Sequence, residues 1–250
     1  MFQDTHIHVQ DLKDKSAINA FVGALETAGF GRLINCAITP ADWALVRALA
    51  DEHTILVPSF GVHPWFADIL DKGWEIRLEA FLRTPGALAG EMGLDKARKN
   101  IDMDVQKDVF ATQLKIAAKV QKPFSVHCVR AWEETVALIQ AHAPGQAFLL
   151  HSFNGSREIA ARVTEMGGYL SFPAKAIHAF NDTDAAVLKT VRLDRILIET
   201  DFPYQIKWTV PQDYIELVQK ACQKAAAIKG VAPDAFTRQV FENGRRFVSS

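Results

Sequence analysis

The feature that most constrains the fold of this 250-residue chain is an alternation of short apolar runs with longer segments of helical periodicity. Eight runs have the β-branched and aromatic composition of buried strands. They are FQDTHIHV, RLINCAI, TILVPSFGVH, ALAGEMGL, PFSVHCV, AFLLHSF, GYLSFPA and RILIETDF. Between two of them, Phe110, Leu114 and Ala117 repeat with the spacing of one helix face.

Near-continuous apolar strands that alternate with helices indicate a parallel sheet covered on both faces. Eight such units in a chain of this length predict an α/β fold, a (β/α)8 TIM barrel of the metal-dependent hydrolase type, with residues 1–250 as its single domain. A doubly wound open sheet is the competing fold class. It needs fewer strands and usually a glycine-rich first turn, whereas the first turn here reads THIHVQD.

Composition and charge narrow the class of protein. The chain is 49% hydrophobic and 23% charged, as globular proteins are. A net charge of −1 argues against nonspecific binding of nucleic acid over the whole surface, although a local basic patch remains possible. The three cysteines form no C-x-x-C pair and suggest neither a disulfide framework nor a thiolate zinc site.

The ends and the hydropathy of the chain predict its location. Met1 leads directly into the first strand pattern, which leaves no room for a signal peptide. No apolar run is long enough to span a bilayer. We therefore expect a cytoplasmic protein without a membrane partner.

Seven histidine and acidic residues interrupt the apolar strand runs near their carboxyl ends, where the strands of a barrel converge on one mouth. They are His6, His8, His63, Glu91, His127, His151 and Asp201. A single histidine in a strand is more often a hydrogen-bonded core residue than a ligand. A whole set is harder to explain that way, because each such group is costly to bury unless it is paired or bound to metal. Alternation along the first strand places Asp4 on the same side as His6 and His8.

This donor set has the chemistry of a metal centre. Four histidines and two carboxylates suit zinc, and also manganese, cobalt or nickel. If two ions share Glu91 as a bridge, each keeps an open position for water. The arrangement predicts a two-metal hydrolase.

A series of motifs extends this prediction over almost the whole chain. The motifs are DTHIH at 4–8, GVHPW at 61–65, GEMGLD at 90–95, VFATQLKIAAKVQKPFSVHC at 109–128, LLHSFNGS at 149–156, GGYLSF at 167–172, LDRILIETDFPY at 193–204 and FENGRRF at 241–247. In this order they resemble the TatD-type metal-dependent hydrolases, a branch of the amidohydrolase-like barrels whose best-known members are deoxyribonucleases. The resemblance implies that His6, His8 and Asp201 bind one metal. It implies that His127 and His151 bind the second, with Glu91 between them.

The activity that the resemblance implies is hydrolysis of phosphodiester bonds by metal-activated water, as in a deoxyribonuclease. The expected cofactors are two divalent ions, of zinc, magnesium or manganese, and Asp201 is the candidate for proton transfer with the water. The expected partner is DNA, single-stranded or at its ends, or a small-molecule substrate. We expect the protein to be a monomer.

Two further residues are candidates for substrate binding. His63 either donates a hydrogen bond to a substrate phosphate or is a buried histidine that orients the turn at Pro64 and Trp65. Arg130 could contact phosphates, although a charge at this point is more often a solvated helix start.

Several neighbours of these residues have two interpretations. Glu199 orients a metal-binding histidine or pairs with an arginine, and Asp95 caps or braces the loop after the fourth strand. Cys128 is expected to point outward, opposite to its neighbour His127. Trp65, Trp132 and Trp208 stack on bases or pack between loops and helices.

The segments that would face the substrate depart from the family pattern. They read KARKN at 96–100, CVRAW at 128–132 and QIKWTVPQDY at 205–214. A small-molecule amidohydrolase or esterase that uses the same metal site is therefore an alternative. A second alternative is a non-catalytic protein that binds metal structurally, against which the presence of all six ligands argues.

Overall fold

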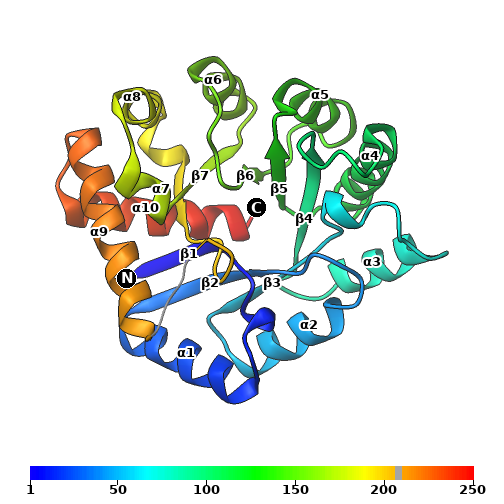
Figure 1. Cartoon of the computed structure of the whole chain (residues 1–250), viewed down its shortest axis with the longest axis horizontal. Coiled ribbons are helices and arrows are strands. Elements are labelled where there is room, and N and C mark those ends of the chain that lie inside the picture. The colour runs from blue at the N-terminus through cyan, green and yellow to red at the C-terminus, as the bar shows by residue number, and fades with distance from the viewer. Residues whose placement is uncertain (206–209) are drawn as a thin grey trace.

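A computed structural model describes residues 1–205 and 210–250 and shows an eight-stranded parallel sheet curled into a nearly closed barrel (Figure 1). Each strand pairs in parallel with the next one along the chain. The strands are β1 (Phe2–Ile7), β2 (Phe30–Cys36), β3 (Leu56–Phe60), β4 (Leu88–Asp95), β5 (Phe124–Val129), β6 (Phe148–Leu150), β7 (Tyr169–Pro173) and β8 (Ile196–Glu199). The predicted TIM barrel is confirmed, and the doubly wound alternative was wrong.

Helices connect the strands and cover the outside of the barrel (Figure 1). The α-helices are α1 (Lys15–Thr27), α2 (Trp43–Glu52), α3 (Trp74–Leu82), α4 (Met103–Val120), α5 (Trp132–His142), α6 (Arg157–Glu165), α7 (Ala174–Ala179), α8 (Asp182–Thr190), α9 (Pro211–Lys229) and α10 (Pro233–Val248). Three short 3-10 turns are η1 (Val9–Asp11), η2 (Pro64–Phe66) and η3 (Leu193–Arg195). Within the described residues, no helix combines the length and the apolar character that crossing a bilayer requires.

The first and last strands meet where the barrel closes. The backbone N–H of Asp201 donates to the carbonyl of His6 at 2.9 Å, and the N–H of His8 donates to the carbonyl of Phe202 at 2.7 Å. Ile7 and Phe202 form an isolated parallel bridge at the same point. These contacts hold the segments that follow β1 and β8 together.

The pairing of β1 with β2 corrects one expectation. Their register shifts between Asp4 and Ile7, so the side chains of β1 do not alternate regularly there. Asp4 accepts a hydrogen bond from the hydroxyl of Tyr214 on α9 rather than joining His6 and His8. The prediction that Asp4 shares their face was wrong, because a bulge interrupts the alternation on which that prediction depended.

The amino end of the barrel is filled and its carboxyl end is open. A small apolar cluster inside the barrel contains Leu88 and Tyr169, which begin β4 and β7, together with Phe247 of α10. The larger core lies between the strands and the surrounding helices. Helix α10 therefore closes the amino end, and the polar side chains collect at the other end.

Several strands end earlier than the sequence pattern predicted. His8, His63, His151 and Asp201 lie one to three residues beyond the strand ends. Only Glu91 and His127 lie well inside strands that reach this face, while His6 is the penultimate residue of β1. All of these positions are at the carboxyl end of the barrel, as expected for site residues of a TIM barrel.

Candidate metal centre

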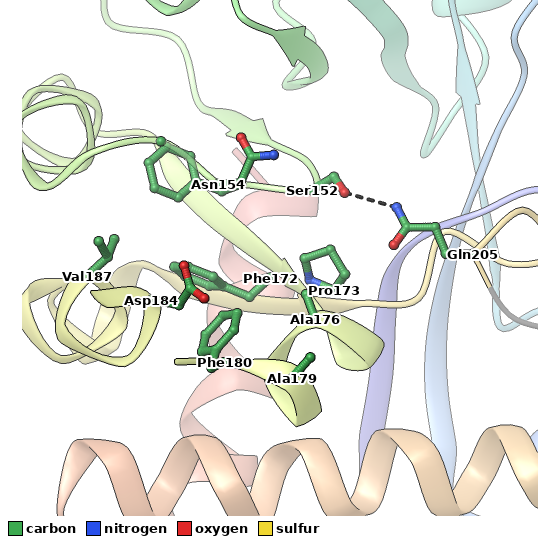
Figure 2. A pocket seen from close by; sticks show the side chains of 12 residues that line it. Ser152, Asn154, Phe172, Pro173, Ala176, Ala179, Phe180, Asp184, Val187 and Gln205 are labelled. Atoms are coloured by element: carbon green, nitrogen blue, oxygen red, sulfur yellow. Dashed lines mark hydrogen bonds between the residues drawn. The ribbon is translucent and has the colours of Figure 1, made fainter. Parts of the chain in front are cut away.

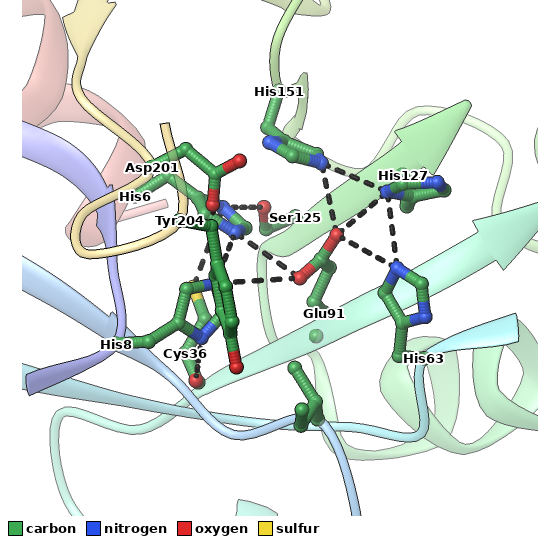
Figure 3. A network of polar contacts seen from close by, with 12 residues as sticks. His6, His8, Cys36, His63, Glu91, Ser125, His127, His151, Asp201 and Tyr204 are labelled. Atoms are coloured by element: carbon green, nitrogen blue, oxygen red, sulfur yellow. Dashed lines mark hydrogen bonds and ion pairs between the residues drawn. The ribbon is translucent and has the colours of Figure 1, made fainter. Parts of the chain in front are cut away.

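The buried carboxylate of Glu91 lies at the middle of the polar cluster (Figure 3). Its Oε2 is 3.1 Å from Nε2 of His6 and 3.7 Å from Nε2 of His8. Its Oε1 is 2.8 Å from Nδ1 of His127 and 2.8 Å from Nε2 of His151. One carboxylate thus faces a pair of imidazoles with each oxygen, which is the geometry that a bridging role requires.

Two glycines bring Glu91 close to β5. A Cβ atom on Gly93 would lie 1.9 Å from the carbonyl oxygen of His127, and one on Gly90 would lie 2.5 Å from that of Ser125. Both glycines also have positive φ angles, of 151° and 125°. Only glycine allows the strands to approach this closely, so the GEMGLD motif is needed for the packing as well as for its carboxylate.

Asp201 joins the His6 and His8 side of the cluster. Its Oδ1 is 3.4 Å from Nε2 of His8, and its Oδ2 accepts a hydrogen bond from Nε2 of Gln205 at 2.9 Å. Its φ of 53° is left-handed, an unusual conformation for a residue other than glycine. Ligand atoms of His6, His8 and Asp201 lie within 4.8 Å of one another, as a shared cation requires.

The outer ring nitrogens of His8 and His6 face acceptors in the protein. Nδ1 of His8 donates to the backbone carbonyl of Cys36 at 2.7 Å. Nδ1 of His6 has weaker partners, Oγ of Ser125 at 3.4 Å and Sγ of Cys36 at 3.5 Å. A proton on each Nδ1 leaves the Nε2 lone pair directed toward Glu91, in the tautomer that binds metal.

His127 and His151 are arranged in the same way through carboxylates. Nε2 of His127 lies 3.6 Å from Oδ2 of Asp95, and Nδ1 of His151 lies 3.4 Å from Oε1 of Glu199. Burial lowers the pKa of His151, but the charges of Glu91 and Glu199 outweigh burial and raise it well above its usual range. The site therefore attracts positive charge strongly. Glu199 has the orienting position that was one of its two interpretations.

His63 has the opposite hydrogen-bonding role from these four histidines, because it presents a donor and not a lone pair to the site. Its Nδ1 accepts a hydrogen bond from the backbone N–H of Trp65 at 3.1 Å, at the start of η2. Burial lowers the pKa of His63 well below its usual range, so the ring is neutral and its proton is on Nε2. That N–H points into the site, 3.5 Å from Oε1 of Glu91 and 3.2 Å from Nδ1 of His127. His63 thus orients the turn and also presents a donor to the cavity.

Distances between imidazole nitrogens test whether the cluster fits a metal. Nε2 of His6 and of His8 are 3.2 Å apart, and Nδ1 of His127 and Nε2 of His151 are 3.1 Å apart. Two nitrogens that bind one tetrahedral zinc ion are about 3.3 Å apart. Buried lone pairs this close repel unless a cation or a proton lies between them. The residues therefore fit divalent cations of the borderline class.

The cluster opens to a cavity of about 250 Å³. Its non-titrating walls are Ile38, Trp65 and Phe66, with Tyr204 on the opposite segment. Trp65 and Tyr204 are 43% and 58% exposed, so aromatic rings flank the mouth. The indole N–H of Trp65 donates to Oδ2 of Asp95 at 2.6 Å, and the guanidinium of Arg98 lies over the indole ring at 4.8 Å.

The predictions for Arg130, for two of the tryptophans and for Cys128 can be compared with the structure in turn. Arg130 is exposed on the segment after β5 and is not among the residues that line the cavity, so its substrate role stays a prediction. Trp132 packs against Phe153 with ring centroids 5.2 Å apart, and Trp208 lies outside the described residues. Cys128 accepts a hydrogen bond from Thr135 of α5 at 3.3 Å, which confirms that it points outward.

Sequence reasoning missed three contributors to this site. Asp95 was expected to brace a loop, and it does accept the N–H of Ala97 at 2.8 Å, but it also faces His127. Its place at the carboxyl end of β4 was the signal that could have found it. No sequence pattern could have identified the backbone carbonyl of Cys36 as the acceptor for His8. Tyr204 ends the LDRILIETDFPY motif, and the motif predicted no role for it in the site.

Comparisons with known proteins identify the family of this chain. The model of the family described as TatD related DNase matches residues 3–249. An uncharacterized metal-dependent hydrolase of Bacillus subtilis, YabD, is 27% identical over 208 residues, which are 82% of this chain and 81% of that protein. The 3'-5' ssDNA/RNA exonuclease TatD of Edwardsiella piscicida is 33% identical over 149 residues, and the match covers 58% of this chain and 56% of that enzyme.

The fold has a close match among solved structures. The crystal structure of YjjV, a TatD homologue from Escherichia coli, superposes with a TM-score of 0.90 at 22% sequence identity. The match covers 100% of this chain and 98% of that one. The family model, which spans nearly all of the sequence, confirms the resemblance seen in the motifs: the chain belongs to the TatD related DNase family.

Proposed function

We propose that this barrel acts over its whole length as one catalytic domain, a nuclease that hydrolyses phosphodiester bonds of single-stranded nucleic acid with two divalent metal ions. His6, His8 and Asp201 would hold one ion, and His127 and His151 the other. Glu91 would contact both. The observation that supports the proposal best is the neutral His63, whose N–H donor lies beside a cluster built to attract cations. A phosphate ester needs both kinds of group.

Ions held by these residues would supply two kinds of chemistry, polarisation of the phosphoryl group and acidification of a water molecule. Asp201 is the candidate proton acceptor. Burial raises the pKa of Asp201, but the hydrogen bond with His8 and the nearby imidazoles outweigh burial and hold it below its usual range. The carboxylate is therefore ionised at neutral pH and able to take a proton.

The remaining polar groups would bind the substrate. The Nε2–H of His63 donates to a phosphoryl oxygen, and the turn at Trp65 keeps the imidazole in that tautomer. Trp65 and Tyr204 flank the mouth and offer faces for bases. Arg130, exposed after β5, is our candidate for phosphates farther along the strand.

The experiment that tests this function uses protein stripped of metal and then reconstituted with magnesium, manganese or zinc. A 5′-labelled single-stranded DNA and an RNA of the same sequence are the substrates. Stepwise shortening that appears only with metal is the expected result. Asp201→Asn should remove most of it, while Asp51→Asn, an exposed carboxylate of α2, should not. Confirmed metal uptake without cleavage of either substrate would contradict the proposal and redirect the assay to lactones and cyclic amides.

A further inference from the structure

A second cavity lies beside the metal centre and has no part in the chemistry described above (Figure 2). Its volume is about 410 Å³, within the range of small-molecule sites. The segment after β6 forms one wall, and α7, α8 and the end of β7 form the other. Its lining includes the aromatic rings of Phe153, Phe172 and Phe180 and the polar side chains of Asn154 and Asp184.

The side chain of Gln205 connects the two cavities. Its Nε2 donates to Oδ2 of Asp201 at 2.9 Å and to Oγ of Ser152 at 3.0 Å. Ser152 and Gln205 line one end of the second cavity (Figure 2), while Asp201 lines the first. The side chain of Gln205 is therefore all that separates the second cavity from Asp201 at the metal centre.

The chemistry of the second cavity is unlike that of the metal centre. The ring of Phe172 lies edge-on to those of Phe153 and Phe180, with centroids 5.9 and 6.2 Å apart. Asp184 adds a carboxylate and Asn154 an amide, and no lysine or arginine is among the described residues of the lining. Beside Asp184 a phosphate would meet a negative charge. The ammonium of Lys175 donates to the backbone carbonyl of Gln205 at 3.0 Å, at the opposite end of the cavity (Figure 2). A flat, uncharged ring that carries N–H donors fits the aromatic walls and the carboxylate together.

We propose that this cavity is a nucleobase subsite, which takes the base of a nucleotide adjoining the phosphodiester bond at the metal centre and favours guanine. The inference rests on the proposed nuclease function. Oδ2 of Asp184 accepts the backbone N–H of Asn181 at 3.3 Å, and this capping box at the start of α8 fixes the carboxylate beside Phe172 and Phe180 (Figure 2). Guanine offers two adjacent N–H donors to such a carboxylate, whereas thymine and uracil lack an amino group.

The first test compares 5′-labelled single strands that carry guanine, thymine or an abasic residue at each position near the cleaved bond. At one position, guanine should be cleaved about tenfold faster than the abasic residue, as loss of one stacked base predicts. Ala179→Phe fills the cavity from α7 and should bring that ratio close to one. Ala80→Phe, an exposed alanine of α3 that lines neither cavity, should keep the wild-type ratio.

A pair of matched variants tests the carboxylate separately. Asp184→Asn should reduce the preference for guanine over thymine. Asp182→Asn removes the same charge two residues away on the same helix, outside the lining, and should leave the preference unchanged. Equal effects of the two variants would show that helix charge, and not recognition of the base, sets the preference.

A binding measurement separates this inference from the nuclease proposal. Guanosine carries no phosphate, so the difference in its binding between the metal-free wild type and metal-free Ala179→Phe, followed by ligand-observed NMR, reports on the second cavity. The wild type and Ala80→Phe should bind it, and Ala179→Phe should not. Cleavage that is indifferent to abasic residues at every position would overturn the subsite and leave the nuclease intact. If no oligonucleotide is cleaved, the nuclease proposal fails. The subsite proposal fails as well if Ala179→Phe binds guanosine as the wild type does, or if the wild type does not bind it.

Discussion

His127 and His63 lie side by side at the mouth of the barrel, with ring nitrogens 3.2 Å apart, but they present opposite groups to the cavity. The difference comes from their outer nitrogens. That of His127 faces the carboxylate of Asp95, whereas that of His63 accepts a backbone N–H from Trp65. His127 therefore offers a lone pair and His63 offers an N–H.

The comparison teaches that residue type and position do not by themselves define a role in this cluster. Both histidines are close to Glu91, and ligand atoms of all three lie within 4.8 Å of one another. A proton on Nε2 nevertheless excludes His63 from binding a cation through that nitrogen in this tautomer. The partner on the far side of each ring decides whether the ring can bind metal or substrate.

The largest effect should follow from removing the charge that both histidines share. In Glu91→Gln, the imidazoles on each side lose the carboxylate that draws cations to the site. We expect bound metal to fall and activity to drop by about 10³ or more, because metal ions contribute several kcal/mol to such reactions. Metal analysis of the purified variant and the oligonucleotide assay measure the two losses. Full metal content with normal activity would contradict the bridging role.

Replacing His63 should separate substrate binding from metal binding. His63→Phe keeps the ring but removes the N–H donor, and we expect kcat to fall about 10²-fold with metal content unchanged. His63→Gln retains a side-chain N–H and should recover part of the activity. His53→Gln, which removes an imidazole that pairs with Asn19 outside both cavities, is the control.

The two roles of His63 are distinguished by the metal analysis. Loss of metal in His63→Phe would mean that the imidazole of His63 is itself a metal ligand, either with its ring rotated or in the other tautomer. It would also remove the contrast with His127 on which the proposed function depends.

The sequence predicted the barrel and the meeting of six donor side chains, because strand composition and position at a strand end are local properties. It could not predict the polarity of His63, which depends on one backbone N–H at Trp65. It misplaced Asp4, because the register shift between β1 and β2 is a property of strand pairing and not of either strand. The contact of Asp95 with His127 likewise joins two strands.

Asp95→Asn should weaken the metal site without removing a ligand. Both oxygens of Asp95 accept N–H groups, Oδ2 from Trp65 and Oδ1 from Ala97, so the NH2 of an asparagine would oppose a donor in either orientation. The variant also lacks the negative charge that faces Nε2 of His127. Loss of such an orienting partner typically costs 10–100-fold in metal affinity, and we expect about that. Competition with a chelator measures it. Asp102→Asn, at the start of α4, is the control, and equal affinities in the two variants would contradict the orienting role.

The smallest effect should come from His6, whose outer nitrogen has two weak partners in place of one strong one. Ser125→Ala removes one of them and leaves Sγ of Cys36, so we expect less than about a threefold loss in metal affinity, as for one weak hydrogen bond. The double variant with Cys36→Ala leaves the ring without an outer partner. It should lose more than the sum of the single changes in free energy, because each partner substitutes for the other. Strict additivity in the chelator competition would show that packing, and not hydrogen bonding, orients His6, and would set it apart from His8, His127 and His151.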